Sequence, residues 1–297
     1  MPKSSAKKRS TKPRKKRSAA TSPRFTAKTA DKHELYQLAV QATDREAKFL
    51  SRYVLRYTGR ELRTLREDFC GTALLATTFV TLHDDNHAIG VDLDLPTLEW
   101  GVTHNVNTTL DEEQKLRLTL LNKDVRKVRA PSAQAIAALN FSYSVFQTRK
   151  DLLAYFRACY DGLEPGGVLF VDGWGGPDVQ AIKTDRTRHN GFDYLWEQQF
   201  FDPITHHIQC AITFEFRDGT SMRNAFVYDW RLWTMPELRE LMAEAGFTDV
   251  HVLWEGTLAD TRSGNGVFRR KEIGDADSAW IVYVVGRKPL RRTELRK

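Results

Sequence analysis

Residues 65–76 read Leu-Arg-Glu-Asp-Phe-Cys-Gly-Thr-Ala-Leu-Leu-Ala, and this stretch predicts how the chain folds. The apolar run over 62–69 has the length of a buried strand, and a helical pattern follows over 74–82. Between them lies a short turn of mostly small residues, 70–73. A strand, a tight turn and a helix form the repeating unit of an α/β sheet, in which ligands bind beyond the carboxyl ends of the strands. We therefore take this turn as the first candidate site.

The chain continues to alternate between strands and helices on the carboxyl side of this unit. The apolar patterns predict further strands over 88–93, 116–121, 133–139, 168–172, 250–254 and 280–285, and helices over 96–105, 151–163 and 235–245. A leading helix is predicted over 31–58, ended by Gly59. This alternation predicts an α/β fold with a mostly parallel, seven-stranded Rossmann-like sheet covered by helices on both faces.

A different pattern interrupts this alternation over 190–231. Aromatic and aliphatic residues recur there with a period of two on both sides of an Asp218-Gly219 turn. Period-two alternation around Asp-Gly is a hairpin signal. The pattern predicts three antiparallel strands, inserted after the fifth core strand.

The positive charge of the chain is concentrated at its amino end. Residues 1–28 contain eleven Lys or Arg and no acid, which leaves 34 basic and 38 acidic residues in the remainder, a net charge of −4. We expect residues 1–30 to be a disordered basic tail and 31–297 to form one domain. Such a tail can contact nucleic-acid phosphates, serve as a nuclear address in a eukaryotic cell, or only keep the protein in solution.

Several classes of protein are excluded by the composition. The apolar runs are shorter than the roughly 20 residues of a membrane span, and the amino end has no secretory h-region. The three cysteines are far apart and form no CxxC pair, which favours a reducing compartment. We expect a cytoplasmic protein, or a nuclear one if the cell is eukaryotic, with no metal site and no membrane partner. His83 and His87 lie in a predicted loop.

Acidic residues stand at or near the ends of three successive predicted strands: Glu67, Asp92 and Asp124. Carboxylates suit hydroxyls and amines and do not suit phosphates, so the ligand they imply is a positively charged nucleoside without a pyrophosphate. The G-x-G-x-x-G spacing of dinucleotide-binding enzymes is missing, and so is a P-loop.

On these residues the sequence resembles the class I S-adenosylmethionine-dependent methyltransferases. Residues 65–76 look like the first family motif, with the acid at Glu67 and the small positions at Phe69, Gly71 and Ala73. Residues 89–93 resemble the second motif and 122–125 the third. Residues 163–172 are similar to the family's L-x-P-G-G turn with its following strand, and 244–247 to its x-A-G-F helix end.

The resemblance implies S-adenosylmethionine as cofactor, with Asp92 on the ribose and Asp124 near the adenine amine. The cofactor-binding residues it implies are Glu67, Phe69, Cys70, Gly71, Thr72, Ala73, Asp92, Leu93, Asp124, Val125 and Asn140.

The acceptor side of the site is expected at the end of the fourth strand and under the inserted strands of 190–231, which the resemblance implies form a lid over the substrate. The candidate catalytic residues are Asn140, Tyr143 and Asp229, and the candidate substrate-binding residues are Tyr36, Tyr143, Trp174, Trp196, Tyr228 and Trp230. The aromatic residues could equally form a packed seam or a dimer face.

The expected reaction is methyl transfer to a nitrogen or oxygen atom. The substrate stays open between a small molecule, RNA or DNA, and a protein bound to nucleic acid. A non-catalytic adaptor of the same fold is the remaining alternative, because Phe69 and Ala73 replace glycine.

Overall fold

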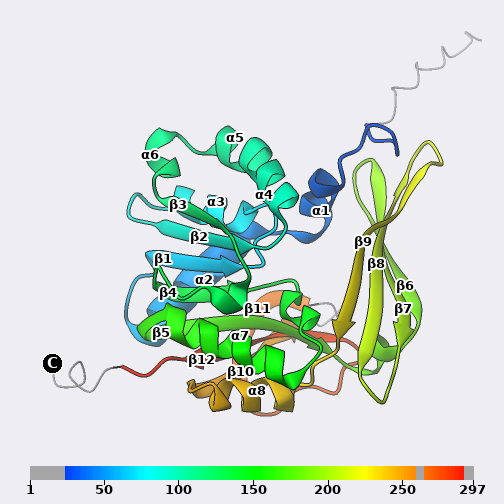
Figure 1. Ribbon diagram of the computed structural model, residues 1–297. Coiled ribbons are helices and arrows are strands. Elements are labelled where there is room, and N and C mark those ends of the chain that lie inside the picture. The colour runs from blue at the N-terminus through cyan, green and yellow to red at the C-terminus, as the bar shows by residue number, and fades with distance from the viewer. Residues whose placement is uncertain (1–23, 259–263, 291–297) are drawn as a thin grey trace, which may run out of the picture.

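A central sheet of eight strands forms the body of the computed structural model, which describes residues 24–258 and 264–290 (Figure 1). The strand order is β11-β10-β12-β5-β4-β1-β2-β3. Strands β1 to β5 run parallel, whereas β10, β11 and β12 pair antiparallel with their neighbours. The strands are β1 (Thr64–Asp68), β2 (His87–Asp92), β3 (Leu118–Asn122), β4 (Ala133–Ala138), β5 (Leu163–Gly175), β10 (Thr248–Thr257), β11 (Gly264–Lys271) and β12 (Trp280–Arg287).

The prediction of a mostly parallel α/β sheet is confirmed, but its expected number of seven strands is one too few. The additional strand is β11, an edge strand that pairs only with β10. Most of its residues are exposed, and its sequence carries only Val267 and Phe268 as large apolar residues. An edge strand needs little burial, so it leaves almost no hydrophobic pattern in the sequence.

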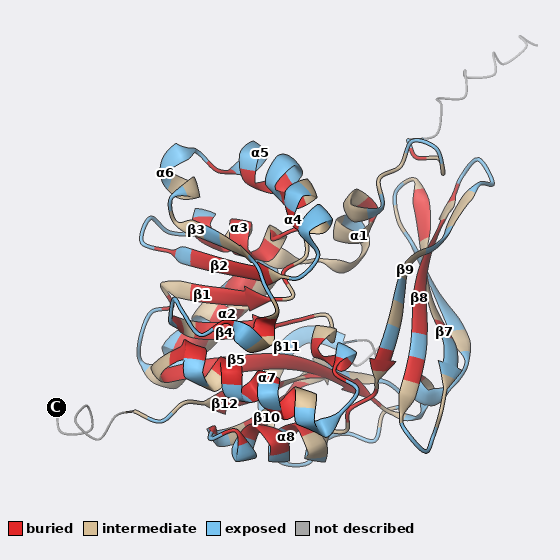
Figure 2. Ribbon diagram, viewed as in Figure 1, coloured by how far each residue is buried: buried red, intermediate tan, exposed pale blue. Residues whose placement is uncertain are grey.

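Helices cover both faces of the sheet and form two separate hydrophobic cores (Figure 2). Helices α2 (Thr43–Thr58) and α3 (Leu74–Thr81) contribute to one core, with α4 (Leu95–Gly101) beside them. Helices α7 (Arg149–Gly162) and α8 (Met235–Glu244) contribute to the other. Two further short helices are α5 (Asn107–Thr109) and α6 (Glu112–Lys115). None of the helices in the described residues is long and apolar enough to span a membrane.

The single leading helix that the sequence predicts over 31–58 is two helices in the structure. Helix α1 (Lys32–Val40) has its C-cap at Gln41, and α2 begins at Thr43. Leu35 of α1 is buried against Phe192 and Phe214 of the inserted strands, whereas α2 packs on the central sheet. The break therefore allows one segment to pack on both the inserted strands and the central sheet. The hydrophobic periodicity of the segment does not predict this break.

The inserted strands form a second sheet that stands beside the central one (Figure 1). Its order is β6-β7-β8-β9, all antiparallel. The strands are β6 (Lys183–Arg188), β7 (Phe192–Phe201), β8 (His207–Phe216) and β9 (Ser221–Arg231). The sequence predicts three of them, over 190–231; β6 is the fourth, and its polar sequence Lys-Thr-Asp-Arg-Thr-Arg shows no alternation. We call this second sheet the lid.

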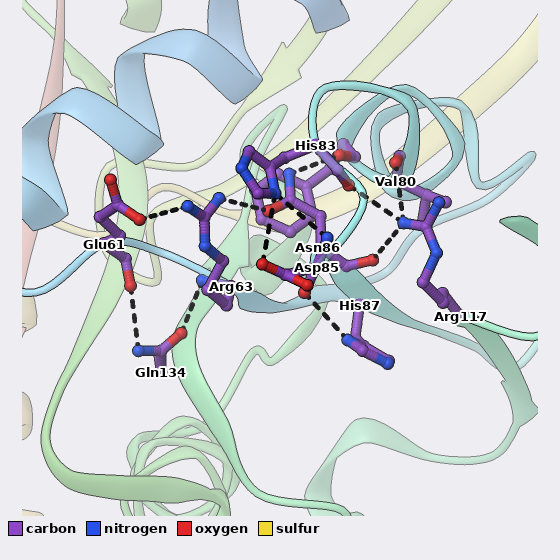
Figure 3. A network of polar contacts seen from close by, with 10 residues as sticks. Glu61, Arg63, Val80, His83, Asp85, Asn86, His87, Arg117 and Gln134 are labelled. Carbon is purple, nitrogen blue, oxygen red and sulfur yellow. Dashed lines mark hydrogen bonds and ion pairs between the residues drawn. The ribbon is translucent and has the colours of Figure 1, made fainter.

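A polar network ties together the loops at the amino ends of strands β1 to β4 (Figure 3). The Arg117 guanidinium donates to the backbone carbonyls of His83 and Asn86 at 3.1 and 2.8 Å. The amide oxygen of Gln134 accepts from the backbone N–H of Arg63 at 2.6 Å. His83 lies in this network, and the described residues contain no group of three or more side chains able to hold a metal ion. This edge is fixed by its own side chains, and the carboxyl ends of the parallel strands lie at the opposite edge.

Candidate functional site

The turn after β1 adopts the backbone of a glycine-rich loop although it has one glycine. Phe69, Gly71 and Ala73 all have a left-handed backbone, with φ of 57°, 53° and 54°. This conformation costs an L-residue roughly 1–2 kcal/mol, so two of the three positions are strained. The strain is kept because Ala73 is fully buried and the Phe69 ring packs against Phe146 and Tyr155.

Two contacts hold this loop at the start of α3. The Glu67 carboxylate, at the end of β1, accepts from the backbone N–H of Ala76 at 2.9 Å. Burial raises the pKa of Glu67 to about 8. On the other side, the Asn105 amide donates to the carbonyl of Thr72 at 2.8 Å. Gly101 of α4 lies against the same carbonyl, where a Cβ would come within 2.3 Å of the oxygen.

We expect Gly101→Ala to destabilise the protein by about 1–3 kcal/mol, the usual cost of overpacking a tight contact. Alanine favours a helix, so helix propensity alone predicts the opposite sign. Urea unfolding followed by circular dichroism measures the change. An equally stable or more stable variant would show that α4 is free to move away from the loop.

Asp92 connects the loop to the end of β2. Its carboxylate accepts from the backbone N–H of Gly71 at 2.7 Å and from that of Asp94 at 2.8 Å. Burial raises the pKa of Asp92 above its usual value. Each oxygen keeps a second lone pair, so the carboxylate can still accept two hydroxyl hydrogen bonds from a ligand.

Asp124, after β3, is engaged differently. Its carboxylate pairs with the Arg126 guanidinium at 2.8 Å, and this pairing lowers the pKa of Asp124. Leu93 lies between the two acids in the chain and is 72% exposed. An exposed leucine beside two carboxylates offers apolar surface next to hydrogen-bond acceptors, which suits a flat, partly apolar ligand.

Three cavities lie in succession along the carboxyl ends of the strands. The edge cavity, about 410 Å³, is lined by Asp92, Leu93, Asp124 and Val125 among others. The loop cavity, about 270 Å³, is lined by the turn after β1, including Glu67, Cys70, Gly71 and Thr72. The lid cavity, about 470 Å³, lies between the central sheet and the lid.

Shared walls connect these cavities. Phe69, Asp92 and Val145 line both the edge cavity and the loop cavity. Among the described residues, the loop cavity and the lid cavity share four, which we call the junction: Tyr36, Asn140, Tyr228 and Trp230. The hydroxyl groups of Tyr36 and Tyr228 lie close to each other. The junction therefore places α1, the end of β4 and the lid strand β9 around one point.

Many of the residues that line the lid cavity are aromatic. Trp174 and Trp196, two of the predicted substrate-binding residues, line it together with three aromatic residues that the sequence analysis missed: Phe141, Tyr194 and Trp280. Tyr194 belongs to the alternating pattern of the lid strands, and this alternation is the signal that could have identified it. Phe141 and Trp280, which begins the last strand, carry no such signal.

Two of the predicted catalytic residues do not line any of the three cavities. Tyr143 is buried in the core beneath α7 and α8, since the turn Ser142–Val145 directs its ring inward. Asp229 lies between Tyr228 and Trp230 on β9, so its side chain points to the opposite face and is 60% exposed. There it hydrogen-bonds to His207, which lowers the pKa of Asp229. The structure thus gives neither residue access to the junction.

A residue that the sequence analysis did not single out supports the junction from below. The buried carboxylate of Asp172, on β5, accepts from the backbone N–H of Phe141 at 2.9 Å. Asn140 and Phe141 are both left-handed, with φ of 57°. Burial raises the pKa of Asp172 to about 7. The carboxylate stabilises the strained turn that presents Asn140 to the two cavities.

Solved structures of similar fold are methyltransferases. The chain superposes on an S-adenosylmethionine-dependent methyltransferase from Clostridium acetobutylicum with a TM-score of 0.62 and 16% identity, covering 86% of this chain and 97% of that one. An amino pentose methyltransferase from Micromonospora echinaspora, solved with S-adenosylmethionine, gives 0.60 and 16%, covering 86% and 95%. A sugar N-methyltransferase from a Streptoalloteichus species gives 0.57 and 17%, covering 92% and 98%.

No protein-family model matches the chain, and no curated protein matches it in sequence. The likeness to the solved structures is a likeness of fold. The chain has the fold of the S-adenosylmethionine-dependent methyltransferases, as the order of its motifs predicts.

Proposed function

We propose that this protein is an S-adenosylmethionine-dependent methyltransferase whose methyl acceptor is a small molecule. One observation carries the proposal: the edge, loop and lid cavities form a connected series with the motif loop at its centre. A nucleoside, a sulfonium-bearing amino acid chain and an acceptor need three such compartments in this order.

The residues of the first two cavities fit this cofactor. Asp92 keeps two lone pairs for the ribose hydroxyls, and Leu93 and Val125 offer apolar surface to the adenine. The carboxylate of Asp124 is assigned to the adenine amine. It would then accept hydrogen bonds from both this amine and the Arg126 guanidinium. Glu67 and the loop N–H groups line the compartment for the amino acid part. When bound, the cofactor supplies a methyl group already activated by a positively charged sulfur.

The protein's own contribution is then to hold the acceptor in line and to exclude water. Methyl transfer between two well-oriented partners gains most of its rate from alignment. The junction residues Tyr36, Asn140 and Tyr228 provide hydrogen-bonding groups at the contact between the two cavities. Trp230 and the rest of the lid cover this point from outside.

A small acceptor is favoured over a nucleic acid by the lid cavity and by the charge of the domain. A volume of about 470 Å³ lies in the usual range of small-molecule pockets. The chain outside residues 1–28 has a net charge of −4, which disfavours a broad phosphate-binding face. The basic cluster that motivates a nucleic-acid partner lies almost entirely in residues 1–23, outside the described residues.

Two measurements test the proposal. Calorimetric titration with S-adenosylhomocysteine should give one site per chain, with a dissociation constant in about the micromolar range. Methyl-labelled S-adenosylmethionine, incubated with the protein and an extract of its own cells, should yield label that passes a size filter and resists nuclease and protease. Lack of binding at millimolar ligand would instead support the non-catalytic adaptor, and nuclease-sensitive label would support a nucleic-acid substrate.

The raised pKa of Glu67 predicts how cofactor binding depends on pH. Glu67 is largely protonated at pH 7 and loses its proton as the pH rises through about 8. The new negative charge favours the cationic sulfonium of S-adenosylmethionine and has little effect on the neutral thioether of S-adenosylhomocysteine. The ratio of the two affinities should therefore increase by about tenfold between pH 7 and pH 9.

Calorimetry with both ligands at each pH measures this ratio. The Glu67→Gln variant is the control, because it keeps the titration of the amino groups of the two ligands and lacks that of Glu67, so the tenfold increase should be absent from it. An equal pH dependence of the ratio in both proteins would place the sulfonium away from Glu67.

A further inference from the structure

We propose that the methyl acceptor is an amine nitrogen, carried by a molecule with a flat and largely apolar body. This inference rests on the proposed function, because it concerns the acceptor of the same reaction. It follows from what the junction contains and from how charge moves during the transfer.

The four junction residues include no group that can take a proton near neutral pH. Asn140 and Trp230 have no basic side-chain atom, and burial raises the pKa of the Tyr36 and Tyr228 hydroxyls above their usual values. Both phenols therefore stay neutral. An alcohol or phenol must lose its proton to become a good nucleophile, so it needs a base at this point. A neutral amine already has its lone pair available.

The ionisable groups of the neighbouring walls lie outside the junction. In the loop cavity, Glu67 accepts from the Ala76 N–H, Asp94 accepts from the Thr97 hydroxyl, and the His33 ring packs against Trp100. In the lid cavity, Asp185 pairs with Lys183 at 2.9 Å. Glu255 accepts from the Gly266 N–H at 2.7 Å. None of these carboxylates or rings belongs to the set of residues that line both cavities.

Asp172 is a buried carboxylate beneath the turn that carries Asn140. Its oxygens accept backbone N–H groups of the 140–141 turn, and it does not line either cavity. Asp92 is likewise bound by the N–H groups of Gly71 and Asp94, and it lines the loop and edge cavities only. The junction therefore acts on the acceptor through neutral dipoles and ring faces.

Neutral dipoles and aromatic faces suit a nitrogen acceptor for a second reason. As the nitrogen lone pair forms its bond to the methyl carbon, the carbon–sulfur bond breaks and its electron pair goes to sulfur. The positive charge thus moves from sulfur to nitrogen, and the resulting ammonium later loses a proton to water. The rings of Tyr228 and Trp230, whose centroids are 4.4 Å apart, can attract this charge before and after transfer. An alcohol acceptor instead gives a neutral ether, so the positive charge leaves the site together with the hydroxyl proton.

The walls beyond the junction indicate the body of the acceptor. Phe141 and Trp174 are stacked at 5.2 Å with an interplanar angle of 19°, and Trp196 meets Trp174 edge-on at 6.0 Å. Trp280 lines the same cavity from β12. Aromatic surfaces of this kind bind flat, apolar groups, and the cavity has room for one drug-sized molecule.

The test uses pairs of ring-bearing compounds that share one skeleton and differ only in the nucleophile, such as tryptamine with tryptophol and phenethylamine with 2-phenylethanol. Each compound is incubated with the full-length protein and methyl-labelled S-adenosylmethionine, and mass spectrometry identifies the methylated atom. We expect label on nitrogen, at a rate at least about tenfold above that of the paired alcohol. The rate should also rise with pH, because only the unprotonated amine reacts.

Methylation of the alcohols at a comparable rate would overturn the inference, and so would a panel of such amines in which none is methylated. Binding of S-adenosylhomocysteine by the same preparation separates this failure from failure of the proposed function. The Trp280→Ala variant provides a matched check, since Trp280 lines the lid cavity alone. It should raise KM for the amine about tenfold and leave the S-adenosylhomocysteine affinity unchanged. The Trp280→Phe variant should have a KM close to that of the unmodified protein.

Discussion

Replacing Asp92 with alanine should weaken the binding of S-adenosylhomocysteine by about 100-fold or more. The substitution removes two acceptor sites for the ribose hydroxyls, and hydrogen bonds to a charged group contribute about 1.5–3 kcal/mol each. It also leaves the N–H groups of Gly71 and Asp94 without their acceptor, so the loop loses the contact that joins it to β2. Both effects act in the same direction. Calorimetric titration of the two proteins measures the difference.

Asp229→Ala is the matched control for this experiment. It removes the same carboxylate from a residue that lines none of the three cavities, and its affinity should remain within about twofold of the unmodified protein. Thermal melting of both variants, without ligand, shows whether a loss of affinity reflects unfolding. If Asp92→Ala and the unmodified protein bound S-adenosylhomocysteine with equal affinity, the edge and loop cavities would not be the cofactor site.

Replacing Arg66 with alanine should destabilise the fold by about 3–5 kcal/mol, because it leaves a charged partner buried and unpaired. The side chains of Arg66 and Asp68 are both 0% exposed, and two hydrogen bonds of 2.6 and 2.9 Å join them. Arg66 also donates to the carbonyl of Val128 at 2.9 Å. Without it, Asp68 retains the hydroxyl of Tyr155 at 3.0 Å as its closest partner.

Urea unfolding followed by circular dichroism measures this change, with Arg129→Ala as the control. Arg129 pairs with Asp161 at 3.3 Å, but both side chains are about half exposed, so its loss should cost at most about 1 kcal/mol. If Arg66→Ala prevents folding altogether, the double variant Arg66→Met with Asp68→Leu should recover much of the stability, since no charge is left buried. An Arg66→Ala protein as stable as the Arg129→Ala protein would contradict the prediction.

The motif loop could be predicted from the sequence because its requirements are local. A strand, a short turn and a helix in immediate succession leave little freedom to the backbone between them. The left-handed conformations of Phe69 and Ala73 show that the turn keeps its shape even where glycine is replaced. Likewise, acids at the ends of neighbouring parallel strands must lie at one edge of the sheet, so the proximity of Asp92 to the loop followed from topology.

The residues around the acceptor could be predicted only in part. Tyr36, Asn140, Tyr228 and Trp230 were expected there and do meet at the junction. Tyr143 and Asp229 were expected as well and lie elsewhere, because the side-chain direction in a short turn and the facing of a strand depend on what covers them. Asp172 was not expected, since its interaction is with the backbone of a segment about 30 residues away.

The sequence by itself therefore determined the α/β class, the order of the motifs, the place of the lid in the chain and the position of Glu67, Asp92 and Asp124 at one edge of the sheet. These features depend on short-range periodicity and on the rule that parallel strands end at a common edge. Only the tertiary structure decided that β6 and β11 are strands, that the leading segment bends between two helices, and that the lid faces the loop to enclose an aromatic cavity. Those features arise from contacts between distant segments, and polar edge strands and inter-sheet packing leave no periodic signal in the chain.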